Sequence, residues 1–100
     1  MAIKVLISRQ FKRDRTNEAH NLLREMRSVA TLRPGYISGQ TLVGVENANK
    51  LVVVSTWSGS KRWEEWLKDE KRKEFSKRIE ELLVSPEQVE VFFAGQESHD

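Results

Sequence analysis

The stretch from Leu51 to Trp66, LVVVSTWSGSKRWEEW, decides the fold. It begins with four consecutive aliphatic residues, Leu51 to Val54, which predict a strand buried on both faces. Ser58-Gly59-Ser60 then ends the strand and can start a helix. Trp63 and Trp66 follow at helical spacing. All three tryptophans of the chain fall in this corner, and each can bury roughly 150–250 Å², so we expect the corner to anchor the core.

Four stretches of apolar residues predict strands. The first covers residues 2–11 and the fourth residues 89–93, and in both the apolar residues alternate with others. The second covers residues 36–45, where Gly39 and Gly44 indicate a bulge or a close backbone approach. The third is the aliphatic strand quoted above.

Two helices are predicted between these strands. Apolar residues recur at helical spacing over residues 19–30, and either Asp14 or Thr16 can cap this first helix. The second helix spans about residues 59–83. Its apolar stripe lapses at residues 68–74, which are all charged, and this lapse predicts a kink or a break into two helices.

The predicted order is β-α-β-β-α-β, the ferredoxin-like plan of an α+β fold. In this plan two helices cover one face of a four-stranded antiparallel sheet. The length of 100 residues suits one such domain with a modest core. We assign residues 1–95 to this domain and residues 96–100 to a polar C-terminal tail, which we expect to be frayed.

The face of the sheet that the helices leave open should be polar in a monomer, yet the predicted strands are apolar on both faces. Leu51 and Val53 share one face of the third strand, and Val52 and Val54 share the other. Because monomers seldom expose an apolar face of this kind, we predict that an identical subunit covers it in a homodimer.

Charge and composition exclude several classes of protein. Seventeen basic and 15 acidic residues leave a net charge of +2, which is too small to imply a polyanionic partner. The absence of cysteine excludes a disulfide framework and a thiolate metal site. No apolar stretch approaches the ~20 residues of a membrane span, and the N-terminus lacks the features of a signal peptide. We therefore expect a cytoplasmic protein with no membrane partner.

RNA-recognition domains share this order of elements and offer a competing interpretation. They carry a glycine and stacking aromatic residues on the middle strands. The third strand here, Lys50 to Trp57, has neither the glycine nor those aromatics. We therefore expect no nucleic-acid partner.

Nearly the whole chain resembles the antibiotic biosynthesis monooxygenase family of dimeric α+β barrels. The resemblance rests on Pro34-Gly35-Tyr36 after the first helix and on the runs Val54-Ser55-Thr56-Trp57 and Trp63-Glu64-Glu65-Trp66. It implies a barrel formed across a dimer, with a pocket between the helices and sheet of each subunit. It leaves the reaction open, because the family includes cofactor-independent monooxygenases, haem-degrading enzymes, autoinducer-processing proteins and members without an assigned reaction.

The haem-degrading branch of that family implies three residues. They are the tryptophan of the second helix, a histidine ten residues later that binds iron, and an asparagine late in the first strand. Counted from Trp66, the histidine position is Ser76, and the asparagine position falls at about Ser8. Only Trp66 matches, and serine is not a plausible axial ligand of haem iron. Haem degradation is therefore the less favoured reaction.

Aromatic residues supply four candidates for the pocket: Trp66, Trp63, Tyr36 and Phe75. Trp66 lies on the helix stripe that faces the sheet, so ligand contact and core packing explain it equally well. For Trp63 and Phe75 we favour core packing. Tyr36 has a hydroxyl that can donate to a substrate, but packing at the start of a strand is the favoured interpretation.

Ser8 and Arg9 supply two polar candidates, because they end the first strand where a side chain can enter a cleft. Arg9 also belongs to a basic group around the predicted turn at residues 12–15. For this reason we favour a solvated position for Arg9.

No motif for a metal, flavin, nicotinamide or hydrolytic triad is present, so we expect neither cofactor nor metal and assign no catalytic residue. An oxidation would then draw its electrons from the substrate itself, such as a hydroxyaromatic or a quinol, whose anion the pocket desolvates. The sequence predicts a cofactor-independent monooxygenase-like protein acting on a small electron-rich aromatic. The alternative is a dimeric binding or stress-response protein that does no chemistry.

Overall fold

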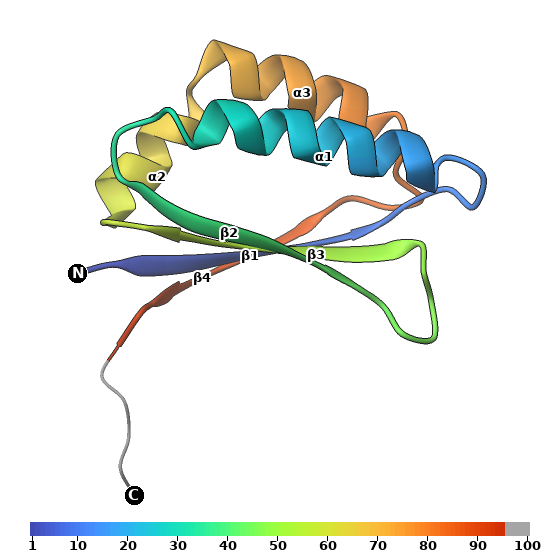
Figure 1. Cartoon of the computed structure of the whole chain (residues 1–100), viewed down its shortest axis with the longest axis horizontal. Coiled ribbons are helices and arrows are strands. Elements are labelled where there is room, and N and C mark those ends of the chain that lie inside the picture. The colour runs from blue at the N-terminus through green and yellow to red at the C-terminus, as the bar shows by residue number, and fades with distance from the viewer. Residues whose placement is uncertain (96–100) are drawn as a thin grey trace, which may run out of the picture.

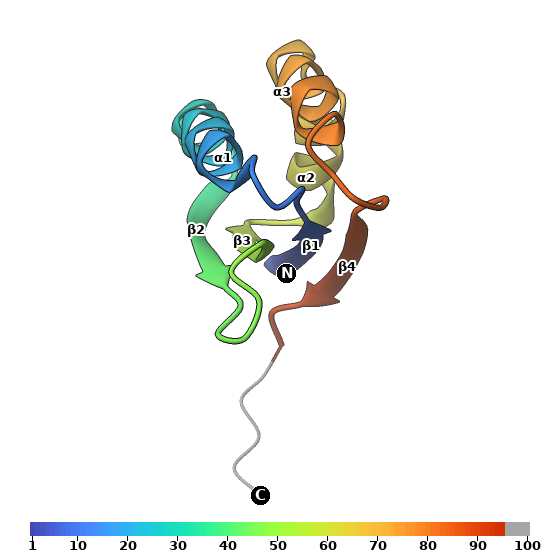
Figure 2. The ribbon, with the colours of Figure 1, turned by 90° about the vertical axis from the view of Figure 1, so that its right-hand side faces the viewer.

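The computed structural model describes residues 1–95, so the predicted tail at 96–100 lies outside the described residues. The helices lie on one face of an antiparallel sheet with strand order β2-β3-β1-β4 (Figure 1, Figure 2). The predicted ferredoxin-like α+β fold is confirmed. No helix within the described part of the chain is long and apolar enough to cross a membrane. The elements are β1 (Ile3–Gln10), α1 (Thr16–Ala30), β2 (Tyr36–Val43), β3 (Lys50–Trp57), α2 (Ser60–Leu67), α3 (Glu70–Glu80) and β4 (Gln88–Phe93).

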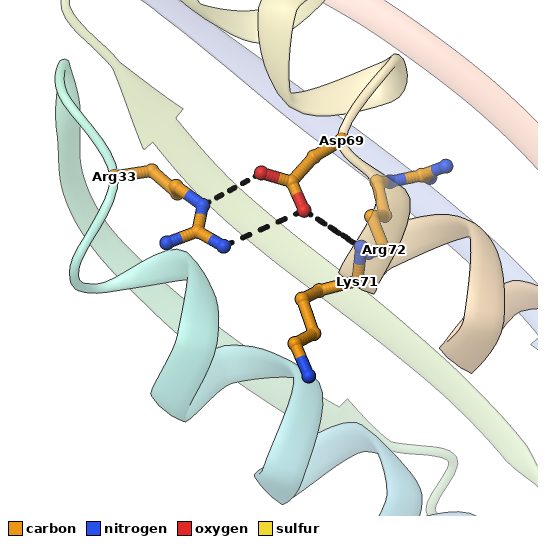
Figure 3. Close-up of polar contacts among 4 residues, drawn as sticks. All are labelled: Arg33, Asp69, Lys71 and Arg72. Atoms are coloured by element: carbon orange, nitrogen blue, oxygen red, sulfur yellow. Dashed lines mark hydrogen bonds and ion pairs between the residues drawn. The ribbon is translucent and has the colours of Figure 1, made fainter.

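The predicted interruption of the second helix is confirmed, since two helices, α2 and α3, occupy its place. Asp69 lies between them and caps α3. Its carboxylate accepts hydrogen bonds from the backbone N–H groups of Lys71 and Arg72, at 2.9 and 3.4 Å. Arg33, just after α1, donates to the same carboxylate from Nε at 2.7 Å (Figure 3). The break therefore has a polar cause in addition to the lapse of the apolar stripe.

The predicted side-chain cap of α1 is wrong. Arg15 occupies the cap position and makes no side-chain cap hydrogen bond. The hydroxyl of Thr16 instead donates to Oδ1 of Asn49 at 2.6 Å. Asn49 belongs to the loop between β2 and β3, so this hydroxyl ties α1 to a neighbouring loop rather than to its own backbone.

The pairing of β1 with β3 sorts their side chains between the two faces of the sheet. Ile7 lies opposite Val53, and Leu6 lies opposite Val54. Ile7 and Val53 face the helices, because both line a cavity beneath them. Since side chains alternate along a strand, Leu6 and Val54 point to the open face.

The strand-to-helix corner anchors the core, as predicted. Trp57, Trp63 and Trp66 all belong to the buried apolar cluster. The Trp66 ring stacks on Trp57 with centroids 6.0 Å apart, and Tyr36 meets Trp57 edge-on at 5.3 Å. Aromatic pairs of this kind add about 0.5–1.5 kcal/mol each beyond the burial of their area.

The open face of the sheet carries an apolar strip, which crosses all four strands. Leu42 and Phe92 are each nearly half exposed, at 44% and 49%. The strip consists of Leu6, Leu42, Val52, Val54 and Phe92. We call it the open-face strip.

The edge strand β4 adds apolar groups beyond this strip. Val89, Val91 and Phe93 alternate with the rest of β4, and all three side chains are exposed. Among residues 1–95, β4 pairs with β1 along one side and has no strand on the other. Both faces of this strand therefore present apolar surface next to an unpaired backbone edge.

Candidate functional site

A cavity lies between the helices and the sheet, and we call it the inner cavity. Its volume of about 40 Å³ is room for a few water molecules and too little for an aromatic ring. An aromatic ligand therefore requires neighbouring side chains to move. The cavity is lined by Ile7, Arg9, Leu23, Met26, Arg27, Ala30, Tyr36, Gly39, Val53, Ser55, Trp57, Trp63, Trp66 and Arg72.

One wall of the inner cavity is aromatic. Trp57 is fixed at its centre, because its indole Nε1 donates to Oγ of Ser55 at 3.2 Å. Trp63 and Trp66 come from α2, one helical turn apart, and each is only 5% exposed. The wall is therefore rigid near Trp57 and is completed by two side chains of one short helix.

Arg9 lies inside the protein, so the predicted solvated position is wrong. It continues the buried alternation of β1 and is 2% exposed. Its Nε donates to Oε1 of Glu87 at the long distance of 3.4 Å. Its Nη1 and Nη2 have no acceptor among the described residues. Burial lowers the pKa of Arg9, while Glu87 acts in the opposite direction.

Arg72 enters the same cavity from the first turn of α3. It is 8% exposed, and its side chain runs away from the Arg33–Asp69 pair (Figure 3). The guanidinium lies over the Trp63 ring, 5.4 Å from its centroid. Nη1 donates to Oγ of Ser76 at 3.4 Å, and the buried Nε has no acceptor among residues 1–95.

The pKa of Arg72 is also lowered, first by burial and further by the charge of Arg9, with Glu87 opposing. The two guanidinium groups therefore repel each other across a site of low polarity. Arg27 adds a third guanidinium to the lining. Within the described chain no Asp or Glu lines the inner cavity.

Tyr36 closes the side of the cavity next to β2. Its hydroxyl occupies the space where Gly39 would carry a Cβ atom, so only glycine permits this approach. Burial raises the pKa of Tyr36, and nearby Arg27 acts against this. Arg27 is itself held by a hydrogen bond from Nη2 to Oγ1 of Thr41 at 2.5 Å. Tyr36 therefore presents a neutral hydroxyl at physiological pH.

The structure brings four of the six predicted pocket residues together. Trp66, Trp63, Tyr36 and Arg9 all line the inner cavity. Their roles toward a ligand stay predictions.

The other two predicted pocket residues lie elsewhere. Ser8 points to the open face, because it alternates with the buried Ile7 and Arg9. Phe75 is half-buried on α3, where it packs against the core and lies under the guanidinium of Arg78.

Sequence reasoning missed Arg27 and Arg72 as cavity residues. Arg72 belongs to the run at residues 68–74, whose charged residues interrupt the predicted apolar stripe. A signal was present, because Arg72, Ser76 and Ile79 stand at helical spacing and share one side of α3. The helical spacing of a charged residue relative to an apolar stripe therefore predicts a cavity position better than the composition of its sequence neighbours does.

Ser76, the position implied for a haem ligand, lies beside Arg72 and accepts its hydrogen bond. Residues 1–95 contain no cluster of three or more His, Asp or Glu side chains that could hold a metal ion. The charged groups that line the inner cavity among these residues are the guanidinium groups of Arg9, Arg27 and Arg72, which are hydrogen-bond donors.

The fold and the inner cavity provide a basis for comparison with known proteins. The sequence profile of the family described as antibiotic biosynthesis monooxygenase matches residues 2–90. The chain belongs to this family. The resemblance noted from Pro34-Gly35-Tyr36 and the tryptophan runs is thereby confirmed. No curated protein is detectably similar to the chain in sequence.

Solved structures of several proteins share the fold at low sequence identity. A conserved protein from Methanosarcina mazei Go1 is 19% identical, with a TM-score of 0.89 over 93% of this chain and 92% of that one. SnoaB, a cofactor-independent oxygenase from Streptomyces nogalater, is 12% identical, with a TM-score of 0.87 over 99% and 98%. Rv0793 from Mycobacterium tuberculosis is 17% identical, with a TM-score of 0.87 over the full length of both chains. These likenesses establish the fold alone.

Proposed function

We propose that this protein is a cofactor-independent monooxygenase that acts on a small electron-rich aromatic, a hydroxyaromatic or a quinol. The observation that carries the proposal is the inner cavity, where an aromatic wall meets buried guanidinium groups in a chain of the antibiotic biosynthesis monooxygenase family. An aromatic wall suits a planar substrate. The guanidinium groups favour the ionised form of its hydroxyl, and that form gives up electrons more readily than the neutral form.

The proposed reaction balances without an added reductant. For 1-naphthol, one oxygen atom of O₂ becomes a ring carbonyl and the hydroxyl becomes the second carbonyl of a naphthoquinone. The other oxygen atom leaves as water with the hydroxyl proton and one ring hydrogen. The substrate supplies all four electrons. The protein has to bind the ring, stabilise the oxyanion and exclude bulk water.

The proposed functional form of the protein is a dimer of two identical subunits. We propose that the open-face strip and the apolar groups of β4 are buried against a second copy of the chain. Their exposure in the single chain supports this, since Phe92 and Phe93 are 49% and 69% exposed. A closed dimer would also cover the unpaired edge of β4, which otherwise invites aggregation.

The proposed activity is tested by oxygen uptake with purified, metal-free protein and a panel of anthrols, naphthols and hydroquinones. We expect at least one naphthol or anthrol to be oxidised faster than in buffer alone, with one O₂ consumed and no H₂O₂ released per quinone formed. The same panel is screened for binding by the shift in melting temperature. A panel in which compounds bind but none is oxidised above the uncatalysed rate contradicts the oxygenase proposal.

One observation favours the rival function, a binding protein without chemistry. Among the described residues that line the inner cavity there is no carboxylate or imidazole, so no ordinary general base faces the ligand. A substrate that ionises in solution needs no such base, whereas a weakly acidic one does. The panel includes compounds that ionise readily in solution and compounds that are only weakly acidic. Oxidation of any of them supports the oxygenase, whereas binding without oxidation supports the binding protein.

A further inference from the structure

We propose that Arg9 and Arg72 form the binding site for the oxyanion of the ligand, either a carboxylate or a phenolate. The inference deepens the proposed function, since it names the charged group of the ligand on which that function rests. It comes from hydrogen-bond donors that the protein buries and leaves without acceptors.

Leaving these buried donors unpaired costs free energy. Buried side-chain N–H groups in folded proteins nearly always have a partner. Arg9 leaves both terminal nitrogens without an acceptor among residues 1–95, and Arg72 leaves its Nε. An arginine at the surface escapes this cost by hydration, but these two are only 2% and 8% exposed. Their burial therefore calls for an acceptor that the described chain does not supply.

The charges around the two arginines are not balanced. Arg9 and Arg72 both line the inner cavity and repel each other. Glu87 is the one carboxylate within hydrogen-bonding distance of either among residues 1–95, and it reaches only Arg9, at 3.4 Å. One negative charge thus faces two buried positive charges. Removing charges from water is costly unless they are compensated, and a bound oxyanion would supply the missing charge.

The shape of the guanidinium groups and the size of the cavity also suit an oxyanion. A guanidinium presents a planar fork that matches two oxygen atoms, and such charged hydrogen bonds are the strong ones. The inner cavity, at about 40 Å³, suits an oxyanion head group better than a whole ring. Trp63 places a flat face beside Arg72, with the guanidinium 5.4 Å from the ring centroid. A ring attached to the oxyanion would extend along this aromatic wall only after neighbouring side chains move, because the cavity has no room for it.

The test compares two probes of nearly equal shape, salicylate and salicylamide, in titration calorimetry with the full chain. We expect salicylate to bind at least tenfold more tightly, because only the anion satisfies both guanidinium groups. Arg72→Met and Arg9→Met should each weaken salicylate roughly ten- to a hundredfold, the range for losing a charged hydrogen bond. They should weaken salicylamide by much less, because a neutral carbonyl makes only the weaker, uncharged type of hydrogen-bond acceptor. Arg24→Met, which alters an exposed arginine of α1, is the matched control and should change neither.

Two variants have effects whose direction the inference also predicts. Glu87→Gln removes the resident carboxylate and should tighten salicylate binding several-fold. Arg72→Met relieves a buried, poorly paired charge, so the ligand-free variant should melt at the same temperature as the wild type or higher. A purely structural arginine would give the reverse, a lower melting temperature with anion binding unchanged.

Defined results overturn the inference. They are absence of salicylate binding at millimolar concentration, equal affinity for the two probes, or anion binding that survives both arginine substitutions. Binding and melting are read without oxygen uptake, so this inference and the proposed oxygenase can fail separately. Anion binding without oxidation leaves the inference standing. Oxidation at an unchanged rate in Arg72→Met leaves the oxygenase standing and removes the inference.

Discussion

Arg33 and Asp69 join the end of α1 to the start of α3, with Nε of the arginine 2.7 Å from Oδ2 of the aspartate (Figure 3). The same carboxylate caps α3 by accepting the backbone N–H groups of Lys71 and Arg72. One side chain thus fixes both the break after α2 and the direction in which α3 leaves. Because Arg72 lies in the first turn of α3, this contact also positions a guanidinium in the inner cavity.

Replacing Asp69 by alanine should lower the free energy of unfolding by about 1–2 kcal/mol, the sum of a lost helix cap and a partly exposed ion pair. Urea denaturation at neutral pH measures the change. Asp69→Asn keeps an oxygen that can cap the helix and should lose less than alanine does. Equal stability of wild type and Asp69→Ala would show that the cap and the ion pair contribute nothing.

The same contact predicts a dependence on pH. The hydrogen bond from Arg33 holds the pKa of Asp69 below its usual value, with smaller help from the backbone of α3. The ionised carboxylate therefore stabilises the fold fully above the ordinary pKa of about 3.9, and this contribution is lost as the pH falls through the lowered value. The stability gap between wild type and Asp69→Asn should close over that acidic range.

Tyr36 and Gly39 give a third prediction, which concerns the β2 side of the cavity. Gly39→Ala places a methyl group where the Tyr36 hydroxyl lies, so the ring must move. We expect a loss of about 1–3 kcal/mol, as for overpacking in other cores. In the Tyr36→Phe background the same substitution should cost less. A double-mutant cycle in urea measures the coupling, and full additivity would contradict direct contact.

Much of the fold follows from the sequence because apolar periodicity reports which side of an element is buried. Alternation over residues 2–11 predicts β1 correctly, and the tryptophan corner predicts the core. The break after α2 is also visible as a lapse in the apolar stripe. Its polar cause is not, because the Arg33–Asp69 contact joins residues 36 positions apart.

The candidate site is harder to predict for a related reason. Local composition favours a solvated position for Arg9 and for Arg72, and tertiary packing overrides it in both cases. The position of Ser8 near the end of β1 predicts a place in the pocket, but strand alternation turns its side chain to the open face. A periodicity that includes charged residues as well as apolar ones predicts the observed positions of Arg9, Arg72 and Ser8.

The open-face strip predicts a dimer. Val54→Asp places a charge in the centre of the proposed interface, where burying it unpaired costs several kcal/mol. Sedimentation at micromolar concentration should report twice the chain mass of 11.6 kDa for the wild type, and a monomer or aggregates for the variant. Val84→Asp, an equal change at an exposed residue before β4, is the control and should stay dimeric. A monomeric wild type would rule out the barrel.

Because Ser76 stands at the position of the iron-binding histidine, we predict that the protein does not degrade haem as the haem-degrading branch does. Titration of the wild type with haemin should give no sharp Soret band of a histidine-ligated iron, and ascorbate should yield no ring-opened pigment. Ser76→His restores the implied ligand and serves as the comparison. Clean turnover of haem by the wild type would show that serine at this position does not decide the chemistry.

The central claim is that the inner cavity is where an electron-rich aromatic reacts with oxygen. The most direct test is the rate of oxygen uptake by metal-free wild type and by Trp66→Phe, with the best substrate of the panel. Phenylalanine keeps most of the apolar bulk and removes the indole N–H. We predict that the variant folds, keeps its dimer and turns over about tenfold more slowly, a loss of about 1.4 kcal/mol of transition-state stabilisation. Equal rates in the two proteins, or a wild-type rate no faster than buffer, would contradict the claim.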